Sequence, residues 1–182
     1  MKMRLGFMVA LLITTTTACS ITNRSDTDEG STSEMNLQEA ADTADAILDD
    51  TFAAIDPPVE WTHNETMAGE CSTERSRSVM TVISRDKQRE FMTTVEKHWK
   101  AQGFKYRASS RDGEAVYYWT PDKFQVRLKF GWKNQAHFEV VTPCVKKTPV
   151  THPTSRYDSL DYHGKERPAP NRHSDYWSSD KG

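Results

Sequence analysis

Two stretches of the chain place apolar residues three or four positions apart, which is the spacing of one face of an α-helix. In residues 36–55 these positions are Leu37, Ala40, Ala41, Ala44, Ile47, Leu48 and Ile55. In residues 86–102 they are Phe91, Val95 and Trp99. Asn36 is a suitable N-cap for the first helix, and Gly103 is a suitable C-terminal cap for the second. The pattern therefore predicts two amphipathic helices.

The polar face of the first predicted helix is acidic. Asp42, Asp45 and Asp49 fall between its apolar positions, and the stretch contains no Lys or Arg. Anionic lipid would repel such a face, so this helix is expected to pack on a domain rather than lie on a membrane. The three aspartates are expected to face water.

Alternation of apolar and polar residues over 114–142 predicts three strands joined by two hairpins. The apolar positions are Ala115, Tyr117, Trp119, Phe124, Val126, Leu128, Phe130, Phe138 and Val140. One register satisfies both hairpins, so we expect an antiparallel meander of three strands.

The loop lengths of this meander decide which side chains share a face. A two-residue loop at residues 121–122 would place Tyr117 opposite Val126, and the second turn is expected near residues 133–135. The second face of the sheet would then carry Val116, Tyr118, Gln125, Arg127, Lys129, His137, Glu139 and Val141.

Shorter strands are expected at residues 78–84 and 104–109, whereas residues 59–76 are expected to be irregular. The resulting order is helix, strand, helix and four strands. The simplest two-layer solution is an α+β fold, in which a small antiparallel sheet is covered on one face by the two helices. This sheet would consist of the meander plus one or two further strands.

One domain is expected between disordered ends. It would span residues 36–146, an ordinary size for a single hydrophobic core. Residues 19–35 and 147–182 show no apolar period, and both are predicted to be disordered because they cannot bury enough surface to fold.

The first nineteen residues have the three parts of a secretory signal. Lys2 and Arg4 precede an apolar run over residues 5–13, and small residues lead from there to Cys19. A membrane-spanning helix needs roughly 20 apolar residues, so a permanent span is not expected. Three interpretations stay open: a lipoprotein signal cut before Cys19, ordinary secretion, and an uncleaved signal anchor.

The end of this leader, Thr16-Thr17-Ala18-Cys19, resembles the lipobox of bacterial lipoproteins. The resemblance implies that residues 1–18 are removed as a signal peptide and that lipid is attached to the Cys19 thiol. Two acyl chains at that position would anchor the protein to the outer face of the cell membrane, with residues 19–35 as a tether. Through its lipobox, its two further cysteines and its segment 140–144, the chain is also similar to small actinobacterial lipoproteins of unknown function. That likeness assigns no site residue.

If Cys19 carries lipid, Cys71 and Cys144 remain as a pair. Thiols outside the cytoplasm tend to oxidise, so we expect these two cysteines to form a disulfide. A metal site is not expected, because neither the cysteines nor the six histidines have the spacing of metal ligands. No cofactor is expected either.

The formal charge of −2 conceals a segregation of signs. Residues 20–50 hold nine acidic residues against one arginine, whereas residues 79–147 hold fourteen Lys and Arg against seven acidic residues. The total charge does not indicate a nucleic-acid partner, but the predicted domain is locally basic.

The second sheet face is the candidate binding surface. Tyr118, Arg127, Lys129 and His137 would lie together there, and positive charge beside an aromatic ring suits an anionic envelope polymer or another envelope protein. The alternative is an ordinary solvated face with a cross-strand pair between Lys129 and Glu139.

Enzyme motifs are absent from the sequence. There is no serine-hydrolase elbow, glycine-rich phosphate loop or Cys/His nucleophile pattern, so no catalytic residue is predicted. The first hypothesis is a non-enzymatic binding or interaction module of the cell envelope, tethered to the membrane. The alternatives are a lipid-anchored enzyme or enzyme accessory acting on cell-wall polymer, and a structural spacer.

Overall fold

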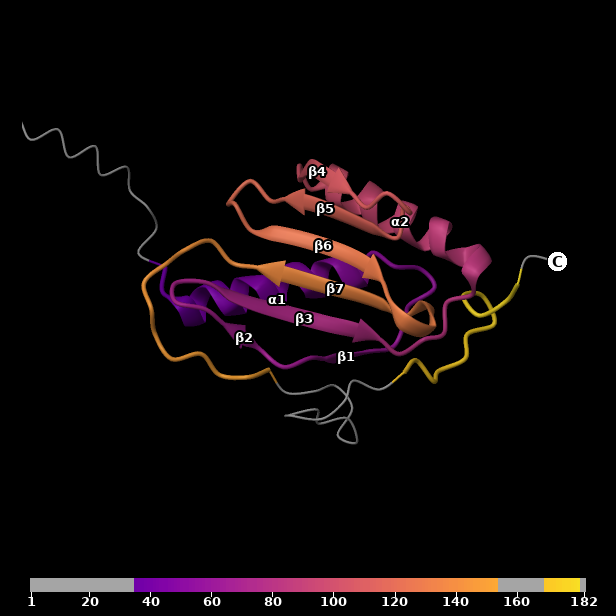
Figure 1. The fold of residues 1–182 in the computed structure, drawn as a ribbon, viewed down its shortest axis with the longest axis horizontal. Helices are drawn as coiled ribbons and strands as arrows, with labels where there is room; N and C mark the ends of the chain where they lie inside the picture. The colour runs from indigo at the N-terminus through magenta and orange to yellow at the C-terminus, as the bar shows by residue number, and fades with distance from the viewer. Residues whose placement is uncertain (1–34, 154–168, 181–182) are drawn as a thin grey trace, which may run out of the picture. The chain divides into compact units, whose positions relative to one another are not determined.

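The structure is a computed structural model, and it describes residues 35–153 and 169–180. Its largest element is an antiparallel sheet with the strand order β1-β3-β7-β6-β5-β4, and a short β2 pairs with β3 (Figure 1). The strands are β1 (Trp61–His63), β2 (Met67–Ala68), β3 (Thr73–Val79), β4 (Lys105–Ser109), β5 (Ala115–Trp119), β6 (Gln125–Phe130) and β7 (Ala136–Val141). The two α-helices are α1 (Leu37–Ala53) and α2 (Gln88–Ala101). The predicted antiparallel α+β class is confirmed, with a sheet larger than expected.

The helix α1 begins where the sequence predicts. The Asn36 side chain accepts hydrogen bonds from the backbone N–H groups of Gln38 at 3.0 Å and Glu39 at 3.1 Å. The Glu39 carboxylate in turn accepts from the Asn36 backbone N–H at 2.9 Å. This capping box satisfies donors that the first helical turn cannot pair internally.

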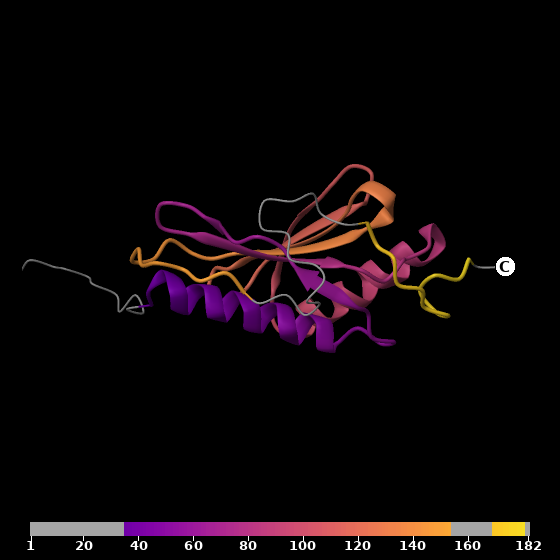
Figure 2. The same cartoon turned by 90° about the horizontal axis from the view of Figure 1, so that it is seen from below.

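One hydrophobic core joins both helices to the sheet. Its members include Leu48 and Phe52 of α1, Phe91, Val95 and Trp99 of α2, and Val126, Leu128, Phe138 and Val140 of β6 and β7. The helix α1 lies against β3 and β7 and runs alongside them in Figure 2. Each large apolar side chain buried in this way stabilises the fold by about 1.5–3 kcal/mol. The shared core therefore fixes the helices relative to the strands.

The segment between the helices contains more strand than the sequence predicts. Residues 59–76 were expected to be irregular, yet they contain β1, β2 and the start of β3. The prediction of a strand at residues 78–84 is wrong, because β3 ends at Val79 and covers only the first two of these residues. The inward positions of β3 are Thr73, Arg75, Arg77 and Val79. Three of these four residues are polar, so this strand lacks the alternation of apolar and polar residues that identifies a half-buried strand.

The C-terminal segment 169–180 is docked on the domain, so the predicted disordered tail is wrong for these residues. Trp177 is 1% exposed, and its indole Nε1 donates a hydrogen bond to the carbonyl oxygen of Pro57 at 2.6 Å. Its ring also meets the Phe91 ring, with 5.2 Å between centroids. A single buried indole leaves no apolar period, which is why the sequence pattern missed it. The predicted leader and nearly all of the tether, residues 1–34, lie outside the described residues, as do residues 154–168 and 181–182.

Candidate functional site

A single turn decides which β5 side chains leave the core. Between β5 and β6 the chain turns through three residues, because the Thr120 N–H donates to the Phe124 oxygen at 2.9 Å and the Lys123 N–H donates to the Thr120 oxygen at 3.1 Å. Lys123 adopts a positive φ of 65°. The predicted two-residue loop is wrong, because such loops need a positive φ at their first position. Pro121 occupies that position, and its ring holds φ at about −65°.

The additional loop residue shifts the register by one and moves each β5 side chain to the opposite face. Tyr118 therefore pairs with Val126 and points into the core, where it is 1% exposed. Its ring centroid lies 5.4 Å from that of Trp99, and its hydroxyl donates to the Glu96 carboxylate at 2.6 Å. Burial raises the pKa of the Tyr118 hydroxyl. The placement of Tyr118 on the binding face is thus corrected.

We call the side of the sheet opposite the core the outer face. In the observed register it carries Ser76, Ser78, Tyr117, Trp119, Gln125, Arg127, Lys129, His137, Glu139 and Val141. Arg127, Lys129 and His137 lie on it as predicted. Sequence reasoning missed Tyr117 and Trp119, and the signal that could have found them was Pro121, which excludes the shorter loop.

The cations predicted for the outer face are paired with carboxylates. Arg127 Nη2 lies 3.1 Å from the Glu74 carboxylate, and Arg127 also contacts the carboxylate of Glu139. Lys129 Nζ lies 2.6 Å from Glu139, which is the cross-strand pair considered in the sequence. Two cations thus face two carboxylates, so this part of the outer face carries little uncompensated charge.

His137 belongs to a buried chain of hydrogen bonds that begins beside this ion network. Its Nδ1 lies 2.9 Å from the Ser78 hydroxyl, which donates to the Asn64 side-chain oxygen at 2.9 Å. Since that hydroxyl hydrogen is used on Asn64, His137 Nδ1 is the donor to Ser78. Ser78 is 0% exposed and its proton points away from the imidazole. The pair therefore has neither the access nor the proton arrangement of a serine nucleophile with its base.

A pocket of about 260 Å³ opens on the outer face over β4, β5 and β6. Its lining includes Arg107, Tyr117, Trp119, Gln125, Arg127 and Val141, together with Ala108 and the core-facing residues Tyr118 and Val126. Arg107 lies at a bulge, where the pairing of β4 with β5 shifts between Tyr106 and Ala108. The Arg107 guanidinium carbon is 5.9 Å from the centroid of the Trp119 ring. The outer-face side chains of the pocket thus supply two aromatic rings, two guanidinium groups and one amide. We call it the outer-face pocket.

Uncompensated positive charge lies at the edge of the sheet, next to this pocket. Lys105 and Arg107 on β4 and Arg111 in the following turn are all exposed. Among the residues that the structure describes, none of these three cations forms an ion pair. The basic character expected on β6 therefore lies two strands further along the sheet, on β4.

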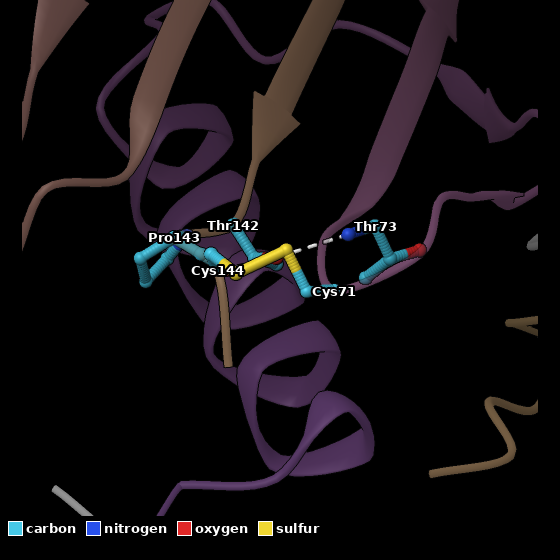
Figure 3. Close-up of a disulfide and its surroundings, with 5 residues drawn as sticks. All are labelled: Cys71, Thr73, Thr142, Pro143 and Cys144. Carbon is cyan, nitrogen blue, oxygen red and sulfur yellow. Dashed lines mark hydrogen bonds between the residues drawn. A yellow bond between two sulfur atoms is a disulfide. The ribbon is translucent and has the colours of Figure 1, made fainter. Parts of the chain in front are cut away.

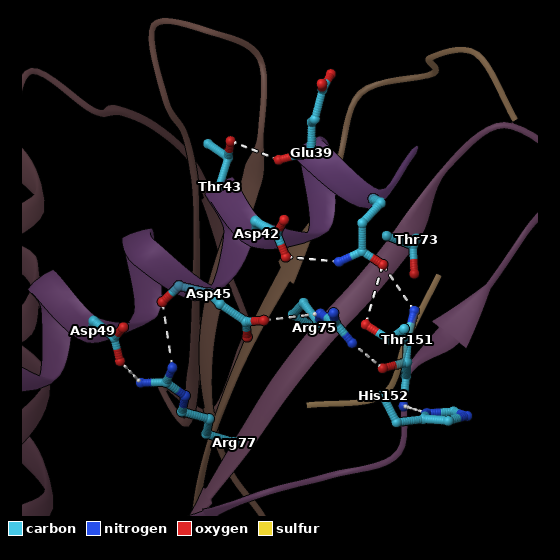
Figure 4. A network of polar contacts seen from close by, with 12 residues as sticks. Glu39, Asp42, Thr43, Asp45, Asp49, Thr73, Arg75, Arg77, Thr151 and His152 are labelled. Carbon is cyan, nitrogen blue, oxygen red and sulfur yellow. Dashed lines mark hydrogen bonds and ion pairs between the residues drawn. The ribbon is translucent and has the colours of Figure 1, made fainter. Parts of the chain in front are cut away.

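A second charge network lies on the core side, between α1 and β3 (Figure 4). Arg75 Nε is 3.1 Å from the Asp45 carboxylate, and Arg77 Nη1 is 2.7 Å from the Asp49 carboxylate. The side chains of both arginines are only 2% exposed. The expectation that Asp45 faces water is therefore wrong, since its side chain is only 22% exposed. Asp49 is 67% exposed as expected, but its carboxylate also pairs with Arg77. We call these four residues the α1–β3 charge network.

Both ion pairs of the α1–β3 charge network can form because the spacing of the two aspartates along the helix nearly equals the spacing of the two arginines along the strand. Four residues of an α-helix rise about 6 Å, and two residues of a strand rise about 6.7 Å. Asp45 and Asp49 are four apart and Arg75 and Arg77 are two apart, so both pairs form side by side. Burial dominates at Asp45 and raises the pKa of its carboxyl despite the two nearby guanidinium groups.

Aromatic rings complete the surroundings of the α1–β3 charge network. The Arg77 guanidinium lies over Trp61, 3.9 Å from the ring centroid, which is the geometry of a cation–π contact. His63, two residues further on β1, has its pKa lowered to about 4 by burial and by repulsion from Arg77 and Arg75. With Asp45, Asp49 and these rings as partners, the buried arginines act as structural groups.

The predicted disulfide between Cys71 and Cys144 is present (Figure 3). It links the residues just before β3 to those just after β7, where the Thr73 N–H also donates to the Thr142 hydroxyl at 3.0 Å. The bond closes a loop with a sequence separation of 73. Such a loop is worth about 4 kcal/mol in the chain-entropy model. Cys19, the predicted lipid-bearing residue, lies outside the described residues.

Known proteins provide no match for this chain, and the described residues contain neither a candidate metal site nor a candidate membrane-spanning helix. No protein-family model, curated protein or solved structure matches this chain. Within residues 35–153 and 169–180, no group of three or more His, Cys, Asp or Glu side chains is arranged to hold a metal ion. No helix in these ranges is both long enough and apolar enough to cross a membrane.

Proposed function

We propose that this protein is a membrane-tethered, extracytoplasmic binding module of the cell envelope, and that the outer-face pocket is its binding site. The module is non-enzymatic. The observation that carries the proposal is the outer-face pocket itself, with Tyr117, Trp119, Arg107 and Arg127 in its lining.

The leader sequence supports the location. In this proposal residues 1–18 are cleaved as a signal peptide, and the lipid on Cys19 holds the protein on the outer face of the cell membrane. A disulfide between Cys71 and Cys144 is consistent with an oxidising compartment.

The chemistry of the pocket supports binding rather than catalysis. Two aromatic rings offer apolar faces, and the guanidinium and amide groups beside them offer hydrogen-bond donors and an acceptor, a combination typical of ligand sites. In this proposal both helices cover the core side of the sheet, so that the outer face is left to the ligand.

Binding to cell-wall material tests the proposal. Full-length protein in detergent should cosediment with purified peptidoglycan that retains its attached polymers. The double variant Tyr117→Ala, Trp119→Ala should bind roughly tenfold more weakly, because aromatic anchors carry much of the energy of such contacts.

The matched control is Trp132→Ala. Trp132 is 70% exposed and is not among the pocket residues, so its loss removes an aromatic ring elsewhere on the surface. Equal binding by the control and the double variant would reject the pocket. In the same cells, the mass of the membrane-fraction protein should match a chain that begins at acylated Cys19, and an intact leader would reject the anchor.

A further inference from the structure

We propose that the outer-face pocket binds an acidic glycan, with sugar rings stacked on Tyr117 and Trp119 and a sugar carboxylate bound by Arg107. This inference rests on the proposed function and names the ligand class of the same site. It follows from three features of the pocket: the spacing of its aromatic rings, the balance of its charges, and the form of the sheet edge beside it.

The aromatic residues form a platform. Tyr117 and Trp119 alternate along β5, so both side chains leave the same face of the sheet about 6.7 Å apart. One face of a sugar ring presents mostly C–H groups, which pack on an aromatic ring while the hydroxyls stay at the rim. Gln125 lies opposite Trp119 in the register, and its amide can both donate to and accept from such hydroxyls.

The charges select an acidic sugar. Arg127 already contacts Glu74 and Glu139, so it lines the pocket as a group whose charge is compensated. Arg107 is exposed, and its guanidinium carbon lies over the Trp119 ring at 5.9 Å from the centroid. Within the described part of the chain no carboxylate is paired with it. A planar guanidinium binds a carboxylate through two parallel hydrogen bonds. A carboxylate on a ring stacked at Trp119 would meet this requirement.

The sheet edge argues against an extended peptide as the occupant. An added strand needs a regular edge, but β4 is interrupted by a bulge between Tyr106 and Ala108. The edge also carries Lys105 and Arg107, and bulges and charged residues are the devices by which sheets prevent strand addition. The same cations favour a polyanion, whose approach they would accelerate at low salt.

The test uses full-length protein, isothermal titration calorimetry and three probes. The first is a hexamer of galacturonic acid, and the second is the same hexamer with its carboxylates reduced to alcohols. The third is linear polyphosphate of similar charge, which carries anionic groups but no sugar ring. We expect the acidic hexamer to bind at least tenfold more tightly than either of the other probes.

Two arginine variants separate the site from general surface charge. Arg107→Gln should weaken binding of the acidic hexamer about tenfold, with Arg107→Lys in between, because lysine keeps the charge but loses the planar fork. Arg89→Gln removes the same charge from an exposed position on α2 and should change Kd less than about twofold. Thermal unfolding of each variant checks that the fold is kept.

Each contrary outcome has a distinct meaning. Equal binding of the reduced hexamer, stronger binding of polyphosphate, equal losses in Arg107→Gln and Arg89→Gln, or no binding of any probe would each overturn the acidic-glycan inference. If peptidoglycan binding is nevertheless lost in the Tyr117→Ala, Trp119→Ala variant, the proposed function stands and only the ligand class is wrong. If that binding is also unaffected, both proposals fail.

Discussion

The strands β3 and β4 belong to one antiparallel sheet and each carries two cations, yet they differ in burial and in strand pairing. All residues of β3 except Glu74 are buried, including Arg75 and Arg77, whereas every residue of β4 is exposed. The strand β3 is paired on both sides, while β4 is the edge strand next to β5.

The difference shows that partners, not the strand sequence, decide the role of a cation. The arginines of β3 lie under α1, whose Asp45 and Asp49 compensate them. A buried charge without such a partner would cost several kcal/mol, so these groups are part of the scaffold. Arg107 of β4 has no carboxylate partner in the described residues, and it stays in water where an anionic ligand can reach it.

The largest expected effect comes from breaking the compensation on β3. Asp45→Ala should lower the free energy of unfolding by about 3 kcal/mol in urea titrations, because it leaves Arg75 buried without its carboxylate. The double variant Asp45→Ala, Arg75→Met should recover most of this loss, since no buried charge is then left unpaired.

Asp42→Ala is the matched control for this prediction. Asp42 lies on the same helix but is exposed and bonds only to Gln38 among the contacts described, so its loss should cost less than about 0.5 kcal/mol. If Asp45→Ala costs no more than the control, the α1–β3 charge network is not a structural feature.

A smaller effect is expected when the pH is lowered, because protonation of His63, next to β3, should reduce the free energy of unfolding. The pKa of His63 falls from 6.5 to about 4 on folding, because burial and the guanidinium groups of Arg77 and Arg75 disfavour the imidazolium. The unfolded chain therefore takes up this proton first, and stability falls as the pH drops from 6.5 to about 4.

The difference between wild type and His63→Gln isolates this contribution. Asp45 works in the opposite sense, because its raised pKa makes protonation favour the folded chain, but it is present in both proteins. Urea midpoints measured at pH 7 and at about pH 4.5 should therefore fall further for wild type than for the variant. Parallel losses in the two proteins would contradict the assignment.

The smallest expected effect is on β4. Arg107→Gln should change the free energy of unfolding by less than about 0.5 kcal/mol, because the side chain is exposed and holds no carboxylate in the described structure. Urea titration beside Asp45→Ala checks this, and a loss comparable to that of Asp45→Ala would show that Arg107 is structural after all.

The sequence by itself determined the features that follow from local contrast between apolar and polar positions. Both helices, the Asn36 cap, the alternation of β6 and the side of the sheet that carries Arg127 and Lys129 are as predicted. The pairing of Cys71 with Cys144 was predicted from the count of cysteines and the expected compartment, and it is present.

Only the tertiary structure decided where the remaining residues act. The strand β3 could not be recognised because two of its inward side chains are arginines. Their burial depends on carboxylates of α1 that lie about thirty positions earlier in the chain. The β5–β6 loop is one residue longer than predicted, and side chains alternate along a strand. Tyr117 and Trp119 therefore lie on the outer face, where Tyr118 was expected. The periodicity of a sequence shows only how apolar and polar residues alternate between neighbours in the chain. Which charges pair, and how many residues a hairpin loop contains, depend on contacts between segments that are distant in the sequence.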